Sequence, residues 1–403
     1  MDIDFIINTM SLKDKVALCS GKDEWRTKEF PKYGISSVMM SDGPSGLRKQ
    51  LGKGDAIGIT KSQAATCFPY ESIAACSFDR ALIGELSTAI AEEAGAAGVA
   101  LLLGPGVNIK RNPLCGRNFE YFSEDPYLAG ELGAAYIAAV EKKGIGTSLK
   151  HFACNNQEYF RMNSNSIIDE RTLREIYLTA FEISVKKGNP SSVMCAYNQV
   201  NDIFCSDNKY LLTDILRNEW GFNGFVVTDW GAIHDRSMAF EAGCDLVMPG
   251  GNAYGEKDVF GNVRRVVLSE KRINQSVKRI LNFIEKGSNT LKAQNSNFNI
   301  DYDKHHKIVQ RIAEESAVLL KNEDKLLPCD INDIAIIGRM AENFRYQGHG
   351  SSRVNPTKVD TILSLLPNIP YAPGYDDEGN TTDEIDLFNN QLSKSVIINN
   401  TAN

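Results

Sequence analysis

The chain has 403 residues, of which 42% are hydrophobic and 24% are charged, with 44 lysines and arginines against 51 acidic residues. This length favours two or three domains, although a single α/β barrel can use about 250 residues. The composition excludes the disordered and collagen-like classes of protein. The net charge of −7 disfavours a nucleic-acid partner, because phosphate contacts need a basic face.

The sequence contains no sign of membrane insertion or export. No segment approaches the ~20 apolar residues that a membrane-spanning helix needs. Residues 1–15 carry acidic groups where a signal peptide carries basic ones, and they lack an apolar centre. Nine cysteines lie between Cys19 and Cys329 without a C-x-x-C pair, which is typical of reduced thiols. We therefore expect a cytoplasmic protein without membrane contact.

Short apolar segments alternate with helical patterns along most of the chain. Residues 80–98 and 173–183 carry apolar side chains at helical spacing. The strand candidates are apolar throughout, as in strands that are covered on both faces, and this alternation predicts a parallel α/β fold. The strand candidates are 37–43, 99–109, 147–153, 191–198, 224–232 and 244–250.

The residues that end these segments favour a barrel over an open sheet. Active sites of (β/α)8 barrels are built from the C-terminal ends of the strands. A dinucleotide-binding sheet would need a glycine fingerprint, and Gly104 and Gly106 lack its third glycine. Most of the predicted strands end in polar residues: Asp42, Asn108, Lys150, His151, Tyr197, Asn198 and Asp229.

The composition changes near the end of this pattern. Residues 286–305 are polar, rich in asparagine and without periodicity, which predicts a linker. We therefore expect a (β/α)8-like barrel over 1–285 and an incomplete second α/β unit over 306–403. In the latter, Ile308, Ile312, Ser316 and Leu319 share one helix face, and strands are predicted at 333–339 and 395–398.

Asp229 is the most informative single residue, because it follows an apolar strand and precedes Trp230. A carboxylate at such a position can be a nucleophile, a base or a metal ligand. The alternative is an N-cap for the next helix.

Lys150 and His151 also end a strand, and both donate hydrogen bonds, which suits a ligand with many hydroxyl groups. Their alternative is a solvated surface pair.

Two further segments fit the same kind of ligand. Asp42 can accept from two neighbouring hydroxyl groups, and Arg48 can hold Asp42 through a bidentate pair; the alternative is a surface turn. Arg117 is either a sugar-binding donor or part of a structural ion-pair network. The five histidines form no metal-binding pattern. We therefore expect a carbohydrate ligand, no metal and no cofactor.

Eight segments, in this order, resemble glycoside hydrolase family 3, in its β-glucosidase branch. They cover nearly all of the chain to about residue 375, and the family combines a barrel domain with an α/β sandwich. The segments are SDGPSGLR (41–48), GPGVNIKRNPLCGRNFEYFSEDPYLAG (104–130), KHFACNNQE (150–158), VMCAYNQVN (193–201), GFVVTDWGA (224–232), DLVMPG (245–250), AEESAVLLKNEDKLLP (313–328) and GSSRVNP (350–356).

The resemblance implies a role for each matching residue. Asp229 is similar to the catalytic nucleophile of the family, and Trp230 to the aromatic wall of the adjoining subsite. Arg48 is expected to support Asp42, and Ser351 to add a contact from the second domain. The residues that resemble the shell around the terminal sugar are Asp42, Arg117, Lys150, His151, Arg161 and Tyr197.

The implied reaction is retaining hydrolysis of terminal, non-reducing β-D-glucosyl residues, through a covalent glycosyl-enzyme on Asp229. The substrate is then a β-glucoside or oligosaccharide. The S-D-G-P form at 41–44 favours a glucosidase, with a xylosidase as the alternative. The KHFACNNQE segment disfavours the N-acetylglucosaminidase branch.

The sequence departs from the family in one respect. The acid/base glutamate of the family lies farther beyond the nucleophile than this chain extends, and Glu378 and Glu384 match no family motif. We therefore expect a C-terminally truncated fragment with impaired catalysis, the alternative being a sugar-binding fragment without turnover. A half-built sheet leaves an open edge, so we expect a homo-oligomer or a partner chain that completes the sandwich.

Overall fold

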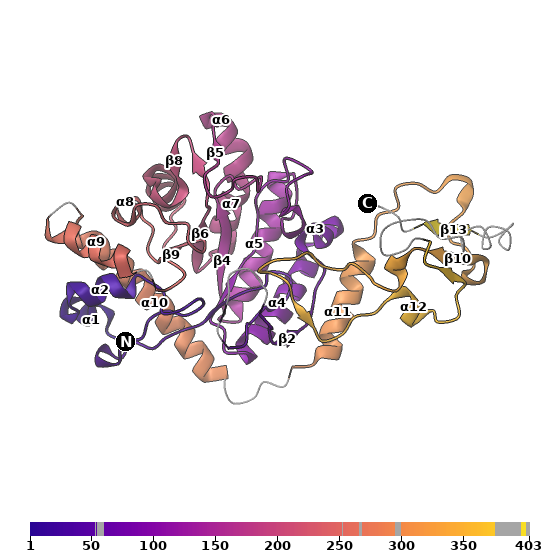
Figure 1. Cartoon of the computed structure of the whole chain (residues 1–403), viewed down its shortest axis with the longest axis horizontal. Coiled ribbons are helices and arrows are strands. Elements are labelled where there is room, and N and C mark those ends of the chain that lie inside the picture. The colour runs from indigo at the N-terminus through magenta and orange to yellow at the C-terminus, as the bar shows by residue number, and fades with distance from the viewer. Residues whose placement is uncertain are drawn as a thin grey trace. The chain divides into compact units, whose positions relative to one another are not determined.

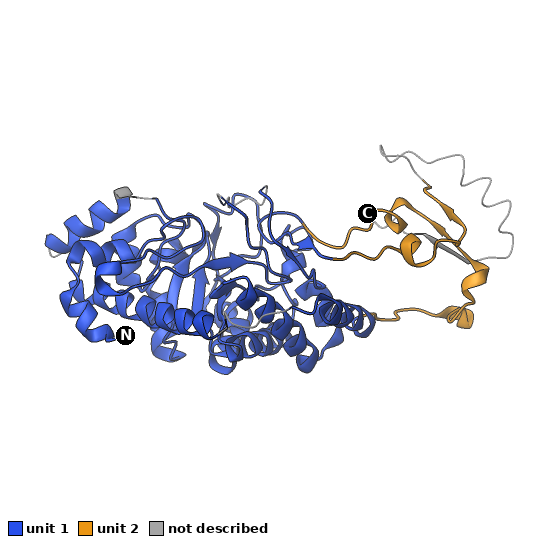
Figure 2. Ribbon diagram, turned by 90° about the horizontal axis from the view of Figure 1, so that it is seen from below, with its two compact units in different colours: residues 1–316, 349–357 blue, residues 317–348, 358–403 orange. Residues whose placement is uncertain are grey.

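The protein forms two compact units, coloured blue and orange in Figure 2. The first unit combines residues 1–316 with 349–357, and the second combines 317–348 with 358–403. The computed structural model describes residues 1–52, 54, 60–251, 253–265, 268–294, 300–374 and 396–399.

A five-stranded parallel sheet forms the centre of the first unit in the described ranges, with the order β1-β3-β4-β6-β9. Every residue of these strands is buried, as expected for segments that are apolar on both faces. The strands are β1 (Met40–Asp42), β3 (Leu101–Leu103), β4 (Gly146–Phe152), β6 (Ser192–Cys195) and β9 (Phe225–Thr228).

Isolated bridges close this sheet into a barrel. Val227 of β9 pairs in parallel with Leu246, and Val247 pairs in parallel with Ser20. The chain then returns to the start of the sheet, where Met39 pairs with the antiparallel segment that follows Ser20. The predicted strand at 244–250 is therefore present only as these bridges. The barrel fold is confirmed, although part of its wall is irregular.

Helices alternate with the strands of the first unit (Figure 1), and α4 and α5 pack against each other beside β4. Asp79 and Asp125 cap α4 and α5 by accepting bonds from the first free N–H groups. The helices are α1 (Ile3–Thr9), α2 (Leu12–Leu18), α3 (Glu71–Ala74), α4 (Arg80–Ala96), α5 (Pro126–Lys142), α6 (Glu170–Thr172), α7 (Thr179–Ile183), α8 (Arg236–Ala242), α9 (Ala253–Arg264), α10 (Glu270–Gln294) and α11 (Tyr302–Glu315).

Two small sheets lie in the first unit, outside the barrel wall. The first brings a distant part of the chain back to the barrel, because residues 349–357 include β11, which pairs in parallel with β2. The second adds a hairpin after β6. Their strands are β2 (Ala64–Ala65), β5 (Asn165–Ser166), β7 (Gln199–Val200), β8 (Ile203–Phe204) and β11 (Asn355–Pro356).

The boundary between the units differs from the predicted domain boundary. Helix α10 extends to Gln294 and α11 begins at Tyr302, so helices occupy much of the predicted linker 286–305. His305, which a linker would leave in solvent, is 2% exposed and bonds to Glu93 on α4. Residues 295–299 lie outside the described residues, and on either side of them the polar composition reflects the outer faces of amphipathic helices.

The second unit contains the two strands that the sequence predicts at 333–339 and 395–398. Strand β10 (Ile334–Ile337) is central and pairs in parallel with β12 (Tyr371–Ala372) and β13 (Val396–Asn399). One short helix, α12 (Ile362–Leu365), accompanies them. The predicted helix face does not reach Leu319, because α11 ends at Glu315 and Leu319 is 65% exposed.

None of the helices in the described part of the chain combines the length and the apolar character that crossing a lipid bilayer requires.

Candidate active site

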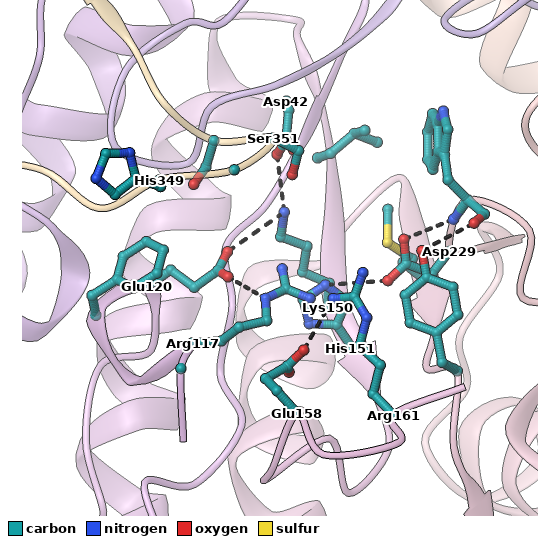
Figure 3. Close-up of a pocket in the computed structure, with 18 of the residues that line it drawn as sticks. Asp42, Arg117, Glu120, Lys150, His151, Glu158, Arg161, Asp229, His349 and Ser351 are labelled. Atoms are coloured by element: carbon teal, nitrogen blue, oxygen red, sulfur yellow. Dashed lines mark hydrogen bonds and ion pairs between the residues drawn. The ribbon is translucent and has the colours of Figure 1, made fainter. Parts of the chain in front are cut away.

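A pocket of about 360 Å³ opens beside the C-terminal ends of the barrel strands and lies within the first unit (Figure 3). This is the end of a barrel at which strand-to-helix loops form active sites. Of the predicted site residues, Arg48 is not among those that line it. The others all do: Asp42, Arg117, Lys150, His151, Arg161, Tyr197, Asp229, Trp230 and Ser351.

Asp229 directly follows β9, and its side chain is 12% exposed. Its Oδ1 accepts a bond of 2.7 Å from the backbone N–H of Trp230, and its Oδ2 lies 3.6 Å from Nε2 of His151. Burial raises the pKa of Asp229, against the opposing positive charge of Arg117. Asp229 is not a helix cap, because Asp235 caps α8. The carboxylate is therefore held from one side and accessible from the pocket.

His151 is a buried neutral imidazole. Burial and the charges of Arg117 and Lys150 hold the pKa of His151 well below its usual value. Its Nδ1 lies 3.0 Å from the hydroxyl of Tyr121, and its backbone N–H donates to Asn108. His151 can therefore exchange hydrogen bonds with a neutral ligand beside Asp229, and it is not a solvated surface residue.

Asp42 and Lys150 form a buried ion pair on another side of the pocket (Figure 3). Nζ of Lys150 lies 3.0 Å from Oδ1 of Asp42 and 4.0 Å from Oε2 of Glu120. Glu120 in turn pairs with Nε of Arg117. Burial acts to raise the pKa of Asp42, but the charge of Lys150 and bonds from Ser351 and Lys150 outweigh it and lower this pKa. Asp42 is therefore an ionised acceptor, and Arg117 both lines the pocket and belongs to an ion-pair network.

Arg48 contacts the returning segment, residues 349–357, rather than lining the pocket. Its backbone N–H donates to the carbonyl of Asp42 at 3.0 Å. Its guanidinium donates to the carbonyl oxygens of Ser351, at 3.1 Å, and Thr60, at 3.3 Å. Arg48 therefore ties the segment that carries Ser351 to the turn that follows β1.

Aromatic side chains form the wall next to Asp229. The rings of Trp230 and Trp25 have centroids 5.2 Å apart and are tilted by 37°. The indole N–H of Trp230 donates to the carbonyl of Glu24 at 2.8 Å, and the hydroxyl of Tyr197 donates to the carbonyl of Trp230 at 3.0 Å. The guanidinium of Arg161 lies 4.7 Å from the centroid of the Tyr197 ring. The position of Trp230 is thus fixed from both sides.

Sequence reasoning missed several residues of the pocket. Trp25 lies ahead of the first strand of the sheet, and Glu120 lies in the short 3₁₀ turn η3 (Asn118–Glu120). Glu158 lines the pocket and pairs with Arg161 at 3.0 Å. His349 lines it from the returning segment. Glu120 and Glu158 carried a usable signal, because each lies three residues from a predicted arginine of the site, Arg117 or Arg161.

The pocket combines fixed charges with an aromatic wall. Its acceptors and donors suit the hydroxyl groups of a sugar, and aromatic rings suit the apolar face of a pyranose. Among the described residues, no group of three or more His, Cys, Asp or Glu side chains is arranged to hold a metal ion.

Comparisons with known proteins agree with this geometry. A family model described as "Glycosyl hydrolase family 3 N terminal domain" matches residues 34–283. "Thermostable beta-glucosidase B" of Acetivibrio thermocellus is 48% identical over 394 residues, which are 95% of this chain and 52% of that protein. "Exo-alpha-(1->6)-L-arabinopyranosidase" of Bifidobacterium longum is 41% identical over 384 residues, which are 92% of this chain and 50% of that protein.

Solved structures show the same similarity. The crystal structure of a family 3 β-glucosidase from Bifidobacterium adolescentis matches with a TM-score of 0.89 and 39% identity, over 98% of this chain and 57% of that one. β-Glucosidase 3B from Thermotoga neapolitana, solved in complex with α-D-glucose, matches with a TM-score of 0.85 and 34% identity, over 98% of this chain and 56% of that one.

The chain spans about half the length of the curated relatives that it matches. The family model covers more than half of the chain, and the segment it matches contains the barrel with Asp42, Lys150 and Asp229. This chain belongs to glycosyl hydrolase family 3.

Proposed function

We propose that this chain carries the sugar-binding and nucleophile part of a retaining β-glucosidase. The observation that supports this most directly is the carboxylate of Asp229, which lines the pocket beside the neutral imidazole of His151. Relatives that are β-glucosidases, and a neighbour with bound glucose, support a glucoside as the substrate. The pocket volume of about 360 Å³ leaves room for a pyranose and part of its leaving group.

In this proposal, an oxygen of Asp229 attacks the anomeric carbon as the bond from that carbon to the leaving oxygen breaks. The displaced oxygen leaves with the electron pair of that bond and takes up a proton. Asp42 and Lys150 bind sugar hydroxyl groups, and His151 and Arg117 bind those nearer to the anomeric carbon. Hydrogen bonds that strengthen as the ring flattens toward the oxocarbenium ion lower the barrier.

The proton donor for the leaving group is not among the carboxylates that line the pocket. Of the described lining residues, Asp42 pairs with Lys150, Glu120 with Arg117 and Glu158 with Arg161. A carboxylate that is held in an ion pair has no proton to give. Glu378 and Glu384 lie outside the described residues. We therefore propose that the described part of the chain does not supply the acid/base group, and loss of that assistance costs about 10²–10⁴ in rate.

Covalent labelling tests the proposal without needing a proton donor. A 2-deoxy-2-fluoro-β-glucosyl fluoride, whose fluoride leaves unprotonated, should add one fluoroglucosyl group to Asp229, read by peptide mass spectrometry. Asp229→Asn should bind glucose but not label. Binding of glucose without labelling of either protein would support the alternative, a sugar-binding fragment. Labelling of a different carboxylate would contradict the role of Asp229.

A second candidate is the cleavage of α-L-arabinopyranosides, which the similarity to an arabinopyranosidase favours. An α-L-arabinopyranoside has an equatorial leaving group, as a β-glucoside has, but it lacks the hydroxymethyl group. The two sugars therefore differ at the end that we assign to Asp42 and Lys150. The test compares burst amplitudes with the 2,4-dinitrophenyl glycosides of glucose, xylose and L-arabinose. The glycoside with the largest burst distinguishes the glucosidase, xylosidase and arabinopyranosidase candidates.

A further inference from the structure

Glu71, at the start of helix α3, is a buried carboxyl group that accepts a hydrogen bond from Ser45, three residues after Asp42 of the pocket. The residue is 4% exposed, and its Oε2 lies 2.7 Å from the hydroxyl oxygen of Ser45. Its Oε1 has no hydrogen-bond partner. Within the part of the chain that the structure describes, no lysine, arginine or histidine lies within ion-pair distance of it.

On one side, Glu71 faces mostly apolar side chains. It borders a small cavity of about 10 Å³, whose other walls include Ile83, Leu86 and Phe122. Burial of an unpaired carboxylate in such surroundings is unfavourable, so the neutral acid is stabilised. Burial accordingly raises the pKa of Glu71 to about 7. Its charge therefore changes near neutral pH.

Ser45 connects Glu71 to the pocket. It lies in the turn that follows Asp42, and the N–H of Phe68 donates to its carbonyl at 2.9 Å. The hydroxyl of Tyr136 donates to the neighbouring carbonyl of Pro44 at 2.9 Å. The turn that sets the position of Asp42 is thus anchored from behind at two carbonyl groups and, through the Ser45 hydroxyl, at Glu71.

The charge of Glu71 also acts on the pocket through space. The negative charge of Glu120 and the positive charge of Lys150 both act on Glu71, the first raising its pKa and the second lowering it. An ionised Glu71 therefore repels Glu120 and attracts Lys150, the ammonium group that balances Asp42.

We propose that Glu71 is a positioning residue for the sugar pocket, which acts on Asp42 and Lys150 through Ser45 and through its own charge. The inference rests on the proposed function, because it assumes that the pocket binds a sugar. The Asp42–Lys150 ion pair determines the expected direction of the pH effect on sugar binding. Ionisation of Glu71 draws Lys150 away from Asp42, so we expect the pocket to bind sugar more weakly as the pH rises through about 7.

Other titratable groups lie near Glu71, so a comparison at Glu71 itself is needed to separate its titration from theirs. Burial raises the pKa of Tyr136 far from neutrality, so its hydroxyl stays neutral. Burial lowers the pKa of Lys110, and the negative charge of Glu71 acts to raise it. On helices α4 and α11, which pack near α3, His305 is paired with Glu92 and Glu93. Replacement of Glu71 alone therefore isolates its contribution.

The test measures the dissociation constant of glucose from about pH 5.5 to about pH 8.5 in three proteins: wild type, Glu71→Gln and Glu182→Gln. The amide introduced by Glu71→Gln keeps an acceptor for Ser45 but cannot ionise. Glu182 pairs with Lys186 on the helix surface and serves as the matched control. We expect wild type and the control to bind about three- to tenfold more weakly at the alkaline end, and Glu71→Gln to show no such change.

Wild-type affinity that does not change with pH overturns the inference, as does an unchanged pH profile in Glu71→Gln. A parallel measurement detects the titration without sugar. Because the folded pKa is raised, wild type should lose stability relative to Glu71→Gln between about pH 4.3 and about pH 7. If that loss is seen while no protein binds glucose at any pH, the proposed function is wrong and the inference falls with it.

Discussion

The carboxyl group of Asp229 is buried, although the proposed function requires it to act as a nucleophile. Burial raises its pKa because it destabilises the ionised carboxylate, while the N–H of Trp230 and the charge of Arg117 oppose that shift. A nucleophile needs the ionised form, and an elevated pKa also makes a carboxylate a stronger base. The raised pKa therefore reflects the poor solvation of this carboxylate.

The pH dependence of labelling tests this balance. Because the pKa of Asp229 is raised, the rate of labelling by the fluoroglucoside should fall, as the solution is acidified, at a higher pH than the usual aspartate value of about 3.9. The measurement is the second-order labelling rate against pH, with unfolding monitored in the same samples. A half-maximal rate below about pH 3.9 contradicts the raised pKa.

The Asp42–Lys150 pair gives a second prediction at this scale. The two side chains are 7% and 3% exposed and lie 3.0 Å apart. Lys150→Met leaves a buried carboxylate without its partner and should lower the free energy of unfolding by about 3–5 kcal/mol. Asp42→Asn with Lys150→Met removes both charges and should recover most of that loss, but not sugar binding. Urea unfolding of the four proteins measures the coupling, and additive losses would contradict it.

The sequence identified most of this site because its residues lie at strand ends. Asp42 ends β1, Asp229 directly follows β9, and Lys150 lies two residues before the end of β4. The C-terminal ends of barrel strands converge. Glu120 lies in a 3₁₀ turn and Trp25 in an irregular loop, so neither position is marked by a repeating pattern. Their roles depend on contacts between distant segments, which one sequence does not reveal.

At the scale of secondary structure, helix α11 is held to the barrel by a buried charged contact. Nδ1 of His305 lies 2.7 Å from Glu93, and Nε2 lies 3.4 Å from Glu92 on α4. Burial acts to lower the pKa of His305, but bonds and charges from Glu93 and Glu92 outweigh it and raise this pKa. Glu93 also accepts from the N–H of Thr66, next to β2, which pairs with the returning strand β11.

This contact should make the stability of the first unit depend on pH. Since the folded pKa of His305 lies above the unfolded value of about 6.5, its contribution is complete below that value and is lost as the pH rises through the folded pKa. The melting temperature of wild type should therefore fall more steeply above about pH 6.5 than that of His305→Gln. His306→Gln, on the same helix, is the control, and equal slopes in all three proteins would contradict the contact.

Element boundaries were harder to predict than element types. The strands of the barrel were found because both of their faces are buried, which leaves an unbroken apolar run. Residues 286–294 and 302–305 were included in a predicted linker because polar residues on the outer faces of α10 and α11 resemble a linker in composition. The contact that buries His305 is made with α4, more than two hundred residues earlier in the chain.

At the scale of the whole molecule, the two units differ in how well they cover their apolar residues. The first unit contains one continuous apolar core that includes the barrel strands and α10. In the second unit, Val318, Leu319 and Leu320 are 59%, 65% and 90% exposed. The alternation of strands and helices predicted the barrel, because strand–helix units that follow each other in the sequence also lie next to each other in the fold. The few elements of the second unit carried less information.

Three consecutive exposed apolar side chains favour self-association. We expect the chain to elute from size-exclusion chromatography as a concentration-dependent oligomer, and Leu319→Lys with Leu320→Lys to shift it toward monomer. Leu114→Lys is the matched control, because Leu114 is an isolated leucine of the first unit that is 91% exposed. Single exposed leucines are common on protein surfaces, so this control should not change the elution volume. A wild-type monomer at all concentrations, or an equal shift in the control, would show that residues 318–320 do not drive association.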